Sequence, residues 1–171
     1  MIIILKYIMN IEQFELKKPD CEKIYKLKLV NSVFYVLKSG KWVLKKFSIN
    51  TGGYYQSSFN FTKNKRIRIS LHRLIYYAHN QDWNIWNDSD ENTIDHISID
   101  NSNNDISNLR ILTKQEQQWN KNAKGYCWNK RDKKWVAQIM VNSKSVHLGC
   151  FDDEEDAKQA YLNAKAIYHV I

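Results

Sequence analysis

Residues 93–112 read TIDHISIDNSNNDISNLRIL. Two runs with apolar residues, 93–97 and 106–112, enclose an asparagine-rich stretch, and this pattern predicts two short strands joined by a polar loop. Thr113 and Glu116 then form a capping box, and good helix formers follow. The expected local order is therefore strand, loop, strand, helix.

Asp95 and His96 stand side by side in the first of these predicted strands. Hydrolysis of a phosphodiester needs a base that deprotonates water and a cation that neutralises the developing charge. A neutral imidazole suits the first task, and a carboxylate is a hard oxygen ligand for Mg²⁺ or Mn²⁺. Because neighbouring residues of a strand point to opposite faces, both side chains can address one phosphate only if the strand ends or bends there. The polar loop permits this.

Several short motifs follow one another along the chain in a fixed order. They are Gly53-Tyr54, Leu71-His72-Arg73-Leu74-Ile75, Asp95-His96, Asn103-Asn104, Asn108-Leu109-Arg110 and the capped helix. The set resembles the HNH endonuclease motif of phage and intron-encoded nucleases, over most of the chain after about Gly52. The resemblance implies a ββα-metal fold, in which one divalent ion lies between the hairpin and the helix.

The resemblance also implies roles for individual residues. His96 would activate the attacking water, and Asn108 would hydrogen-bond across the hairpin to hold the loop that carries His96. Asp95 and a helix side chain would hold one Mg²⁺ or Mn²⁺ ion. Counted from His96, the helix position is Gln117, where the family usually has Asn or His. Asn120 is the alternative ligand, because residues three apart share a helix face.

The charge of the chain is unevenly distributed. The formal net charge is +8, and the stretch from Val36 to Ile75 has basic residues but no Asp or Glu. Such a block favours double-stranded DNA, bound through its phosphates, as the partner. A solvated charged face is the alternative explanation. The residues of this block predicted to contact DNA are Lys63, Lys65, Arg66, Arg68 and Arg73. His72 is expected to be structural or to contact phosphate.

Residues 124–151 alternate between apolar and polar side chains, which predicts a three-stranded sheet. Its apolar face is expected to hold Tyr126, Trp128, Trp135, Ala137, Ile139, Val141, Val146 and Leu148. A helix from about Asp153 would cover this face. The apolar positions of that helix are Ala157, Ala160, Tyr161, Ala164 and Tyr168.

Many residues of this module follow the pattern of a known DNA-binding domain. They are Gly125, Trp128, Lys134-Trp135, Ala137, Ile139, Leu148-Gly149, Phe151, Ala157, Ala160-Tyr161 and Ala164. The module resembles the plant ethylene-response-factor (Apetala-two) domain, which also occurs fused to HNH nucleases. The resemblance implies that the exposed sheet face lies in the major groove. The predicted DNA contacts are Asn129, Lys130, Arg131, Lys134 and Gln138.

Several positions of that face depart from the plant domain, which has arginine or tryptophan among them. They are Cys127, Met140, Ser145 and His147. We therefore expect phosphate contacts, which orient the DNA with modest specificity. A module that binds protein is the alternative.

Together these patterns predict an α+β protein in three parts. A β-rich segment (1–53), with a hairpin around Ser39-Gly40, precedes an HNH nuclease domain (54–122) and the C-terminal DNA-binding domain (123–171). Within the nuclease domain we expect a strand at Arg66–Ile69 and then a helix that Ser70 caps.

Other classes of protein fit the sequence less well. The three cysteines are widely spaced without a Cys-x-x-Cys pair, which argues against a disulfide framework and a structural zinc site and favours an intracellular protein. The apolar stretch Met1–Ile8 is far shorter than the ~20 residues that span a bilayer. It makes Met9 an alternative start. Neither a membrane partner nor a small-molecule cofactor is expected.

The predicted function is that of a metal-dependent HNH endonuclease that hydrolyses DNA phosphodiester bonds, of the homing type found in viruses and mobile elements. One active site per chain predicts nicking unless the protein dimerises or acts twice. The alternative is a non-catalytic DNA-binding protein on a degenerate HNH scaffold, and Gln117 is the main support for it.

Overall fold

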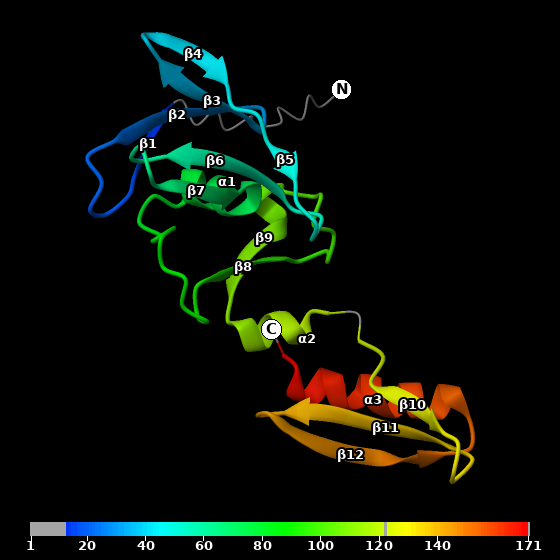
Figure 1. The fold of residues 1–171 in the computed structure, drawn as a ribbon. Helices are drawn as coiled ribbons and strands as arrows, with labels where there is room; N and C mark the ends of the chain where they lie inside the picture. The colour runs from blue at the N-terminus through cyan, green and yellow to red at the C-terminus, as the bar shows by residue number, and fades with distance from the viewer. Residues whose placement is uncertain (1–12, 122, 171) are drawn as a thin grey trace, which may run out of the picture. The chain divides into compact units, whose positions relative to one another are not determined.

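The computed structural model describes residues 13–121 and 123–170 (Figure 1). In these residues the fold mixes three α-helices with four small antiparallel sheets, in agreement with the predicted α+β class. The chain divides into two compact units, Met1–Thr113 and Lys114–Ile171, which are described separately. The boundaries expected after residues 53 and 122 stay predictions. The apolar stretch Met1–Ile8 and the alternative start Met9 lie outside the described residues.

A four-stranded meander opens the first unit. Its strands, in spatial order, are β1 (Phe14–Lys17), β2 (Ile24–Val30), β3 (Val33–Lys38) and β4 (Lys41–Leu44). The hairpin predicted around Ser39-Gly40 is confirmed, since β3 and β4 pair antiparallel and both turn residues have positive φ. A two-residue turn of this kind matches the twist of its flanking strands.

A second sheet leads into the first helix. It consists of β5 (Ser48–Ile49), β6 (Tyr55–Asn60) and β7 (Arg66–Ser70), and α1 (Leu71–His79) follows directly. The predicted strand and helix are thus confirmed. Ser70 lies at the N-cap as expected, but its side chain makes no capping hydrogen bond, so that part of the prediction is wrong.

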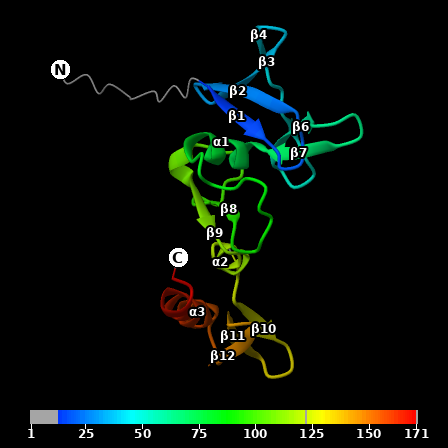
Figure 2. The same cartoon turned by 90° about the vertical axis from the view of Figure 1, so that its left-hand side faces the viewer.

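One hydrophobic core joins these elements of the first unit. It takes side chains from the meander, the second sheet and one face of α1, and the largest fully buried ones are Phe34, Phe59, Leu16, Leu27 and Leu74. Both views show α1 lying against β6 and β7 (Figures 1 and 2). The β-rich N-terminal segment therefore buries the same core as the helix that follows it.

The hairpin predicted at residues 93–112 is present with one correction. The strands β8 (Thr93–His96) and β9 (Leu109–Leu112) pair antiparallel, with His96 opposite Leu109. Residues Ile106–Asn108 form the 3-10 turn η1 instead of strand. The reason is the preceding Asp105, whose carboxylate accepts a hydrogen bond from the Ser107 N–H at 3.1 Å and so starts a helical turn.

The second unit contains the predicted C-terminal sheet and helix. Its elements are α2 (Lys114–Trp119), β10 (Tyr126–Asn129), β11 (Lys134–Val141), β12 (Lys144–Phe151) and α3 (Glu154–Tyr168). The three strands are antiparallel in this order, and α3 covers one face (Figure 2). Ala137 and Ile139 are buried with three residues of α3, namely Ala157, Tyr161 and Ala164.

Three residues expected on this apolar interface are largely exposed: Trp128 is 45% exposed, Tyr168 46% and Val146 37%. Trp128 lies on the edge strand, and Tyr168 is the last residue of α3, so neither position is enclosed by the other layer. Gly125 matters here because a Cβ atom at this position would lie 2.0 Å from the Tyr161 ring. The chain can therefore pass over that ring only as glycine.

Helix α2 contacts the end of α3 within the second unit. The rings of Trp119 and His169 stack with centroids 4.9 Å apart and an interplanar angle of 8°. His169 Nε2 lies 2.8 Å from the carbonyl oxygen of Met140, and Lys165 Nζ donates to the carbonyl of Lys121 at 3.3 Å. These contacts attach the last turn of α2 to the sheet-and-helix module.

Candidate active site

Asp95 faces a cation across the β8–β9 hairpin. Its backbone partner in the ladder is Arg110, and Arg110 Nε donates to Asp95 Oδ2 at 3.1 Å. The Asp95 side chain is only 12% exposed. A charge-assisted hydrogen bond of this length compensates the partly buried carboxylate and limits its rotation.

His96 points to the opposite face of the same strand and is buried, with 4% of its surface exposed. Its Nε2 lies 3.3 Å from Asn104 Oδ1 in the asparagine-rich loop. The strand ends at His96, as a site that uses both side chains requires. The following Ile97 N–H already bonds across to the carbonyl of Asn108, at 2.9 Å.

Asn108 holds this loop from two sides. Its Oδ1 accepts a hydrogen bond from the Ser98 N–H at 2.9 Å, and its Nδ2 donates to the carbonyl of Asn103 at 2.8 Å. The side chain is buried, so both bonds are shielded from competing water. Asn108 thus spans the beginning and the end of the loop, and its part in catalysis stays a prediction.

Two further rings contact His96 and come from distant elements. The Tyr54 ring, just before β6, lies 6.1 Å from the His96 ring, and the His72 ring, on α1, lies 5.1 Å from it. Tyr54 and His72 also contact each other at 5.3 Å. Sequence reasoning gave Tyr54 and Asn104 no role beyond membership in a motif. Tyr54 is 42 residues from His96 along the chain, so no local sequence pattern indicates that their rings are close.

His72 is held in its neutral form. Burial lowers the pKa of His72 to about 3, and the nearby His96 and Arg73 act in the same direction. Histidine has an ordinary pKa of about 6.5, so below that pH His72 is protonated in the unfolded chain. In the folded chain His72 stays neutral until the pH approaches 3. The stability contributed by neutral His72 is therefore complete above about pH 6.5 and is lost as the pH falls toward 3, by at most about 1.4 kcal/mol per pH unit.

We therefore expect His72→Gln to make the free energy of unfolding less dependent on pH between 7.5 and 5. Burial also lowers the pKa of His79, so the variant should remove part of the pH dependence and not all of it. Urea unfolding of both proteins at several pH values measures the effect. Parallel pH curves for the wild type and the variant would contradict it.

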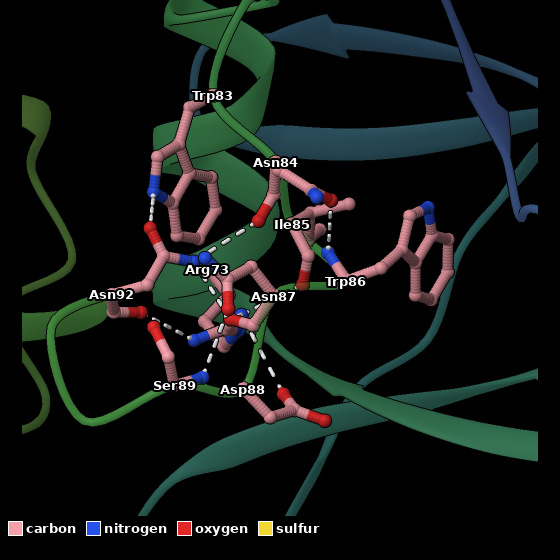
Figure 3. A network of polar contacts seen from close by, with 9 residues as sticks. All are labelled: Arg73, Trp83, Asn84, Ile85, Trp86, Asn87, Asp88, Ser89 and Asn92. Atoms are coloured by element: carbon pink, nitrogen blue, oxygen red, sulfur yellow. Dashed lines mark hydrogen bonds and ion pairs between the residues drawn. The ribbon is translucent and has the colours of Figure 1, made fainter.

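Arg73 reaches from α1 into the segment 80–92 (Figure 3). Its guanidinium donates to the backbone carbonyls of Ile85 at 2.7 Å, Asn92 at 3.3 Å and Asn87 at 3.4 Å. The Asn92 side chain extends the network, because its Nδ2 donates to the carbonyl of Asn87 at 2.7 Å. Arg73 thus fixes the backbone of a long connection that has no regular secondary structure of its own.

The guanidinium of Arg73 has two further neighbours. It lies 4.9 Å from the centroid of the Trp83 ring and 3.9 Å from a carboxylate oxygen of Asp88, whose side chain is 93% exposed. The structure therefore gives Arg73 an internal role in the first unit. Direct DNA contact by Arg73 stays a prediction.

The other predicted DNA contacts of the first unit lie on the β6–β7 hairpin. Lys63 and Lys65 are exposed in its turn, and Arg66 and Arg68 are exposed on one face of β7. In the second unit several predicted contacts bind acidic neighbours. The Asp132 carboxylate accepts hydrogen bonds from Asn129 Nδ2 and from Arg131 Nε, both at 2.8 Å. The Asp152 carboxylate accepts one from Lys134 Nζ at 2.6 Å.

The remaining two contacts predicted for this module, Lys130 and Gln138, are exposed as well. Gln138 lies on β11 and its Oε1 accepts a hydrogen bond from the Ser145 hydroxyl at 3.3 Å. All of these DNA contacts stay predictions.

A metal site has to be judged by the chemistry of its donors. Within the described ranges, no group of three or more His, Cys, Asp or Glu side chains is placed to bind a metal ion. The predicted ligands supply a carboxylate from Asp95 and amide oxygens from Gln117 or Asn120, which are the hard donors that Mg²⁺ and Mn²⁺ accept. Mg²⁺ keeps several water ligands and needs few donors from the protein. That Asp95 of the first unit shares one ion with Gln117 or Asn120 of the second stays a prediction.

The comparison with protein families bears directly on this hairpin. Residues 70–119 match the HNH endonuclease family model. This matched stretch, residues 70–119, is called the HNH segment below. It begins at the N-cap of α1 and ends with the last residue of α2, so it includes both Asp95-His96 and Asn108. It supports a nuclease that acts on DNA, and HNH nucleases generally use divalent metal ions.

The C-terminal sheet and α3 lie outside the HNH segment, and their resemblance to the Apetala-two domain stays a prediction. Searches of curated proteins and of solved structures gave no significant match. No helix in the described part of the chain is long and apolar enough to cross a membrane.

Proposed function

We propose that this protein is a metal-dependent endonuclease that hydrolyses DNA phosphodiester bonds through His96. The observation that carries the proposal is the hairpin of the HNH segment, where Asp95 and His96 end a strand and Asn108 holds the loop that follows. A base and a hard oxygen ligand are consecutive residues there, at the end of the strand, and phosphodiester hydrolysis requires both groups.

The neighbour of His96 determines which ring nitrogen acts as the base. An amide oxygen such as Asn104 Oδ1 can only accept a hydrogen bond, so its position 3.3 Å from Nε2 favours the tautomer of His96 with the proton on Nε2. The lone pair of the neutral imidazole then resides on Nδ1. In this tautomer Nδ1 would take the proton from the attacking water once DNA and water occupy the site, and Asn104 would stabilise the imidazolium that forms.

Asp95, with Gln117 or Asn120, would hold one Mg²⁺ or Mn²⁺ ion. When bound, such an ion neutralises the charge of the scissile phosphate and stabilises the departing 3′ oxygen. Arg110 has a supporting task, because its hydrogen bond keeps Asp95 in one orientation.

Both units would contribute to DNA binding. In the first unit the exposed basic residues of the β6–β7 hairpin would contact phosphates, and in the second unit Lys130 and the sheet face with Gln138 would do so. A protein of this kind, with a nuclease domain at 54–122 and an Apetala-two-like module at 123–171, fits an intracellular homing endonuclease of a mobile element.

One observation favours a second function. Position 117 is Gln where the resembled family has Asn or His, and its extra methylene changes the reach of the amide oxygen. In the second function the HNH scaffold is degenerate and the protein binds DNA without cutting it.

Cleavage of supercoiled plasmid separates the two functions. We expect the purified protein to convert supercoiled DNA to relaxed circles with Mg²⁺ or Mn²⁺, and to leave it intact when EDTA removes the metal. Gel-shift measurements on the same DNA report binding independently. Shifted DNA without strand breaks in either metal would exclude the endonuclease and support the binding protein.

A further inference from the structure

We propose that Tyr54 and His72 are positioning residues of the nuclease, and that their rings hold the His96 imidazole in the orientation it needs to act as a base. This inference rests on the proposed function. The two residues belong neither to the loop that Asn108 holds nor to the Asp95–Arg110 pair.

The three rings form a closed triangle. The centroid distances are 5.1 Å for His72–His96, 5.3 Å for Tyr54–His72 and 6.1 Å for Tyr54–His96. The two contacts of His72 are edge-to-face, with interplanar angles of 74° to His96 and 62° to Tyr54. Edge-to-face packing fixes the angle between rings, because the positive edge of one ring meets the negative face of the other.

The triangle is rigid because each ring comes from a different anchored element. A tight turn presents Tyr54: Asn50 Oδ1 accepts hydrogen bonds from the Gly52 and Tyr54 N–H groups at 2.9 and 3.0 Å. Gly53 has φ +80, which glycine adopts without strain. The turn therefore sets the direction in which the Tyr54 ring leaves the backbone.

His72 is anchored through α1. The helix buries Leu74, Ile75 and Ala78 in the core, and Arg73 ties it to the segment 80–92. Rotation of α1 about its axis would break both sets of contacts. The His72 ring is therefore fixed relative to β8 without a hydrogen bond of its own to His96.

The ring of His96 starts from a less regular part of the fold than the ring of His72. His96 is the last residue of a four-residue strand, and its contact with Asn104 comes from a loop. A hydrogen bond of 3.3 Å is at the long end of the range, so the two ring contacts add orientation that this bond supplies only weakly. A small displacement of a catalytic base lowers the rate by up to about 100-fold, so rigid neighbours that orient the His96 ring should increase the rate.

The test compares variants that remove a ring with variants that keep it. For Tyr54→Leu and for His72→Leu we expect kcat for plasmid nicking to fall about 10-fold, while KM for DNA changes less than about two-fold. Tyr54→Phe and His72→Phe keep the rings and should restore most of the rate. Equal activity of the ring-removing variants and the wild type would overturn the proposal.

Tyr76→Leu is the matched control. Tyr76 is also a half-buried tyrosine of the first unit, and its ring contacts Trp83 at 5.2 Å. The control should lose stability like Tyr54→Leu but keep its kcat, measured at a temperature where every variant is folded. A matching loss of kcat in Tyr76→Leu would show a general effect of destabilisation and overturn the proposal.

A second readout does not depend on cleavage. The ¹⁵N shifts of the His96 ring, assigned by comparison with His96→Gln, report its tautomer. We expect a dominant Nε2–H form in the wild type and averaged shifts in Tyr54→Leu and His72→Leu. If the wild-type protein cuts no DNA, the proposed endonuclease function is excluded, but the NMR measurement still tests the arrangement of the rings. Unchanged shifts in both variants would then overturn the ring arrangement as well.

Discussion

Replacement of His96 by alanine is expected to abolish strand cleavage while DNA binding persists. A positioned general base contributes about 10²–10⁴-fold to a rate, and His96 is the base in the proposed mechanism. The change leaves in place every basic residue that is proposed to contact DNA. Plasmid nicking in Mg²⁺ should therefore fall by at least about 100-fold, and the gel-shift affinity should stay within about three-fold.

The control for this variant is His79→Ala. His79 is a half-buried histidine at the end of α1, outside the proposed chemistry. It should cleave at the wild-type rate. Because His96 is buried, thermal unfolding of His96→Ala must show a folded protein at the assay temperature. A folded His96→Ala that nicks as fast as the wild type would exclude His96 as the base.

Replacement of Arg73 by methionine should give the largest loss of stability, about 3 kcal/mol. Methionine retains the apolar stem but removes the guanidinium donor from the carbonyl oxygens of Ile85 and Asn92. The carbonyl of Asn87 also loses Arg73 but keeps the hydrogen bond from Asn92 Nδ2. Hydrogen bonds from charged groups contribute about 1.5–3 kcal/mol each, and part of this is regained when water reaches the exposed carbonyls. Urea unfolding measures the change.

Two variants identify the source of the Arg73 effect. Asp88→Asn removes the ion pair alone, and since Asp88 is 93% exposed the loss should stay below about 1 kcal/mol. Arg73→Lys keeps the charge but replaces the two terminal nitrogens of the planar guanidinium by one, so it should behave more like the methionine variant. A large loss in Asp88→Asn would show that the charge pair, and not the carbonyl contacts, holds the segment. DNA affinity of Arg73→Met tests the predicted DNA contact.

Local patterns in the sequence were sufficient for most elements of the fold. The alternation at Arg66–Ile69, the helical spacing after Leu71 and the hairpin around Ser39-Gly40 each predicted the observed element. These features depend on residues close in sequence, where propensity and period act directly. The error at Ile106–Asn108 has the same origin, because an apolar run hid the cap that Asp105 provides for a helical turn.

The surroundings of the candidate base could not be predicted in this way. Asp95, His96 and Asn108 stand in one motif, so their proximity follows from a single hairpin. The ring of Tyr54 reaches His96 only because two sheets and a helix share one core. Likewise, nothing in the residues of the segment 80–92 marks its backbone carbonyls as the acceptors of Arg73.

The stack between Trp119 and His169 affects how this chain can be recombined with others. Trp119 is the last residue of the HNH segment, yet its ring lies on a residue next to the end of α3. A chimaera joined directly after Trp119 would keep every residue of the segment but give Trp119 a foreign neighbour. A crossover before α2 would avoid this mismatch but would also remove Gln117, a proposed metal ligand. Exchange of the C-terminal module should therefore preserve more stability when the incoming module brings an aromatic residue that can stack on Trp119 in place of His169.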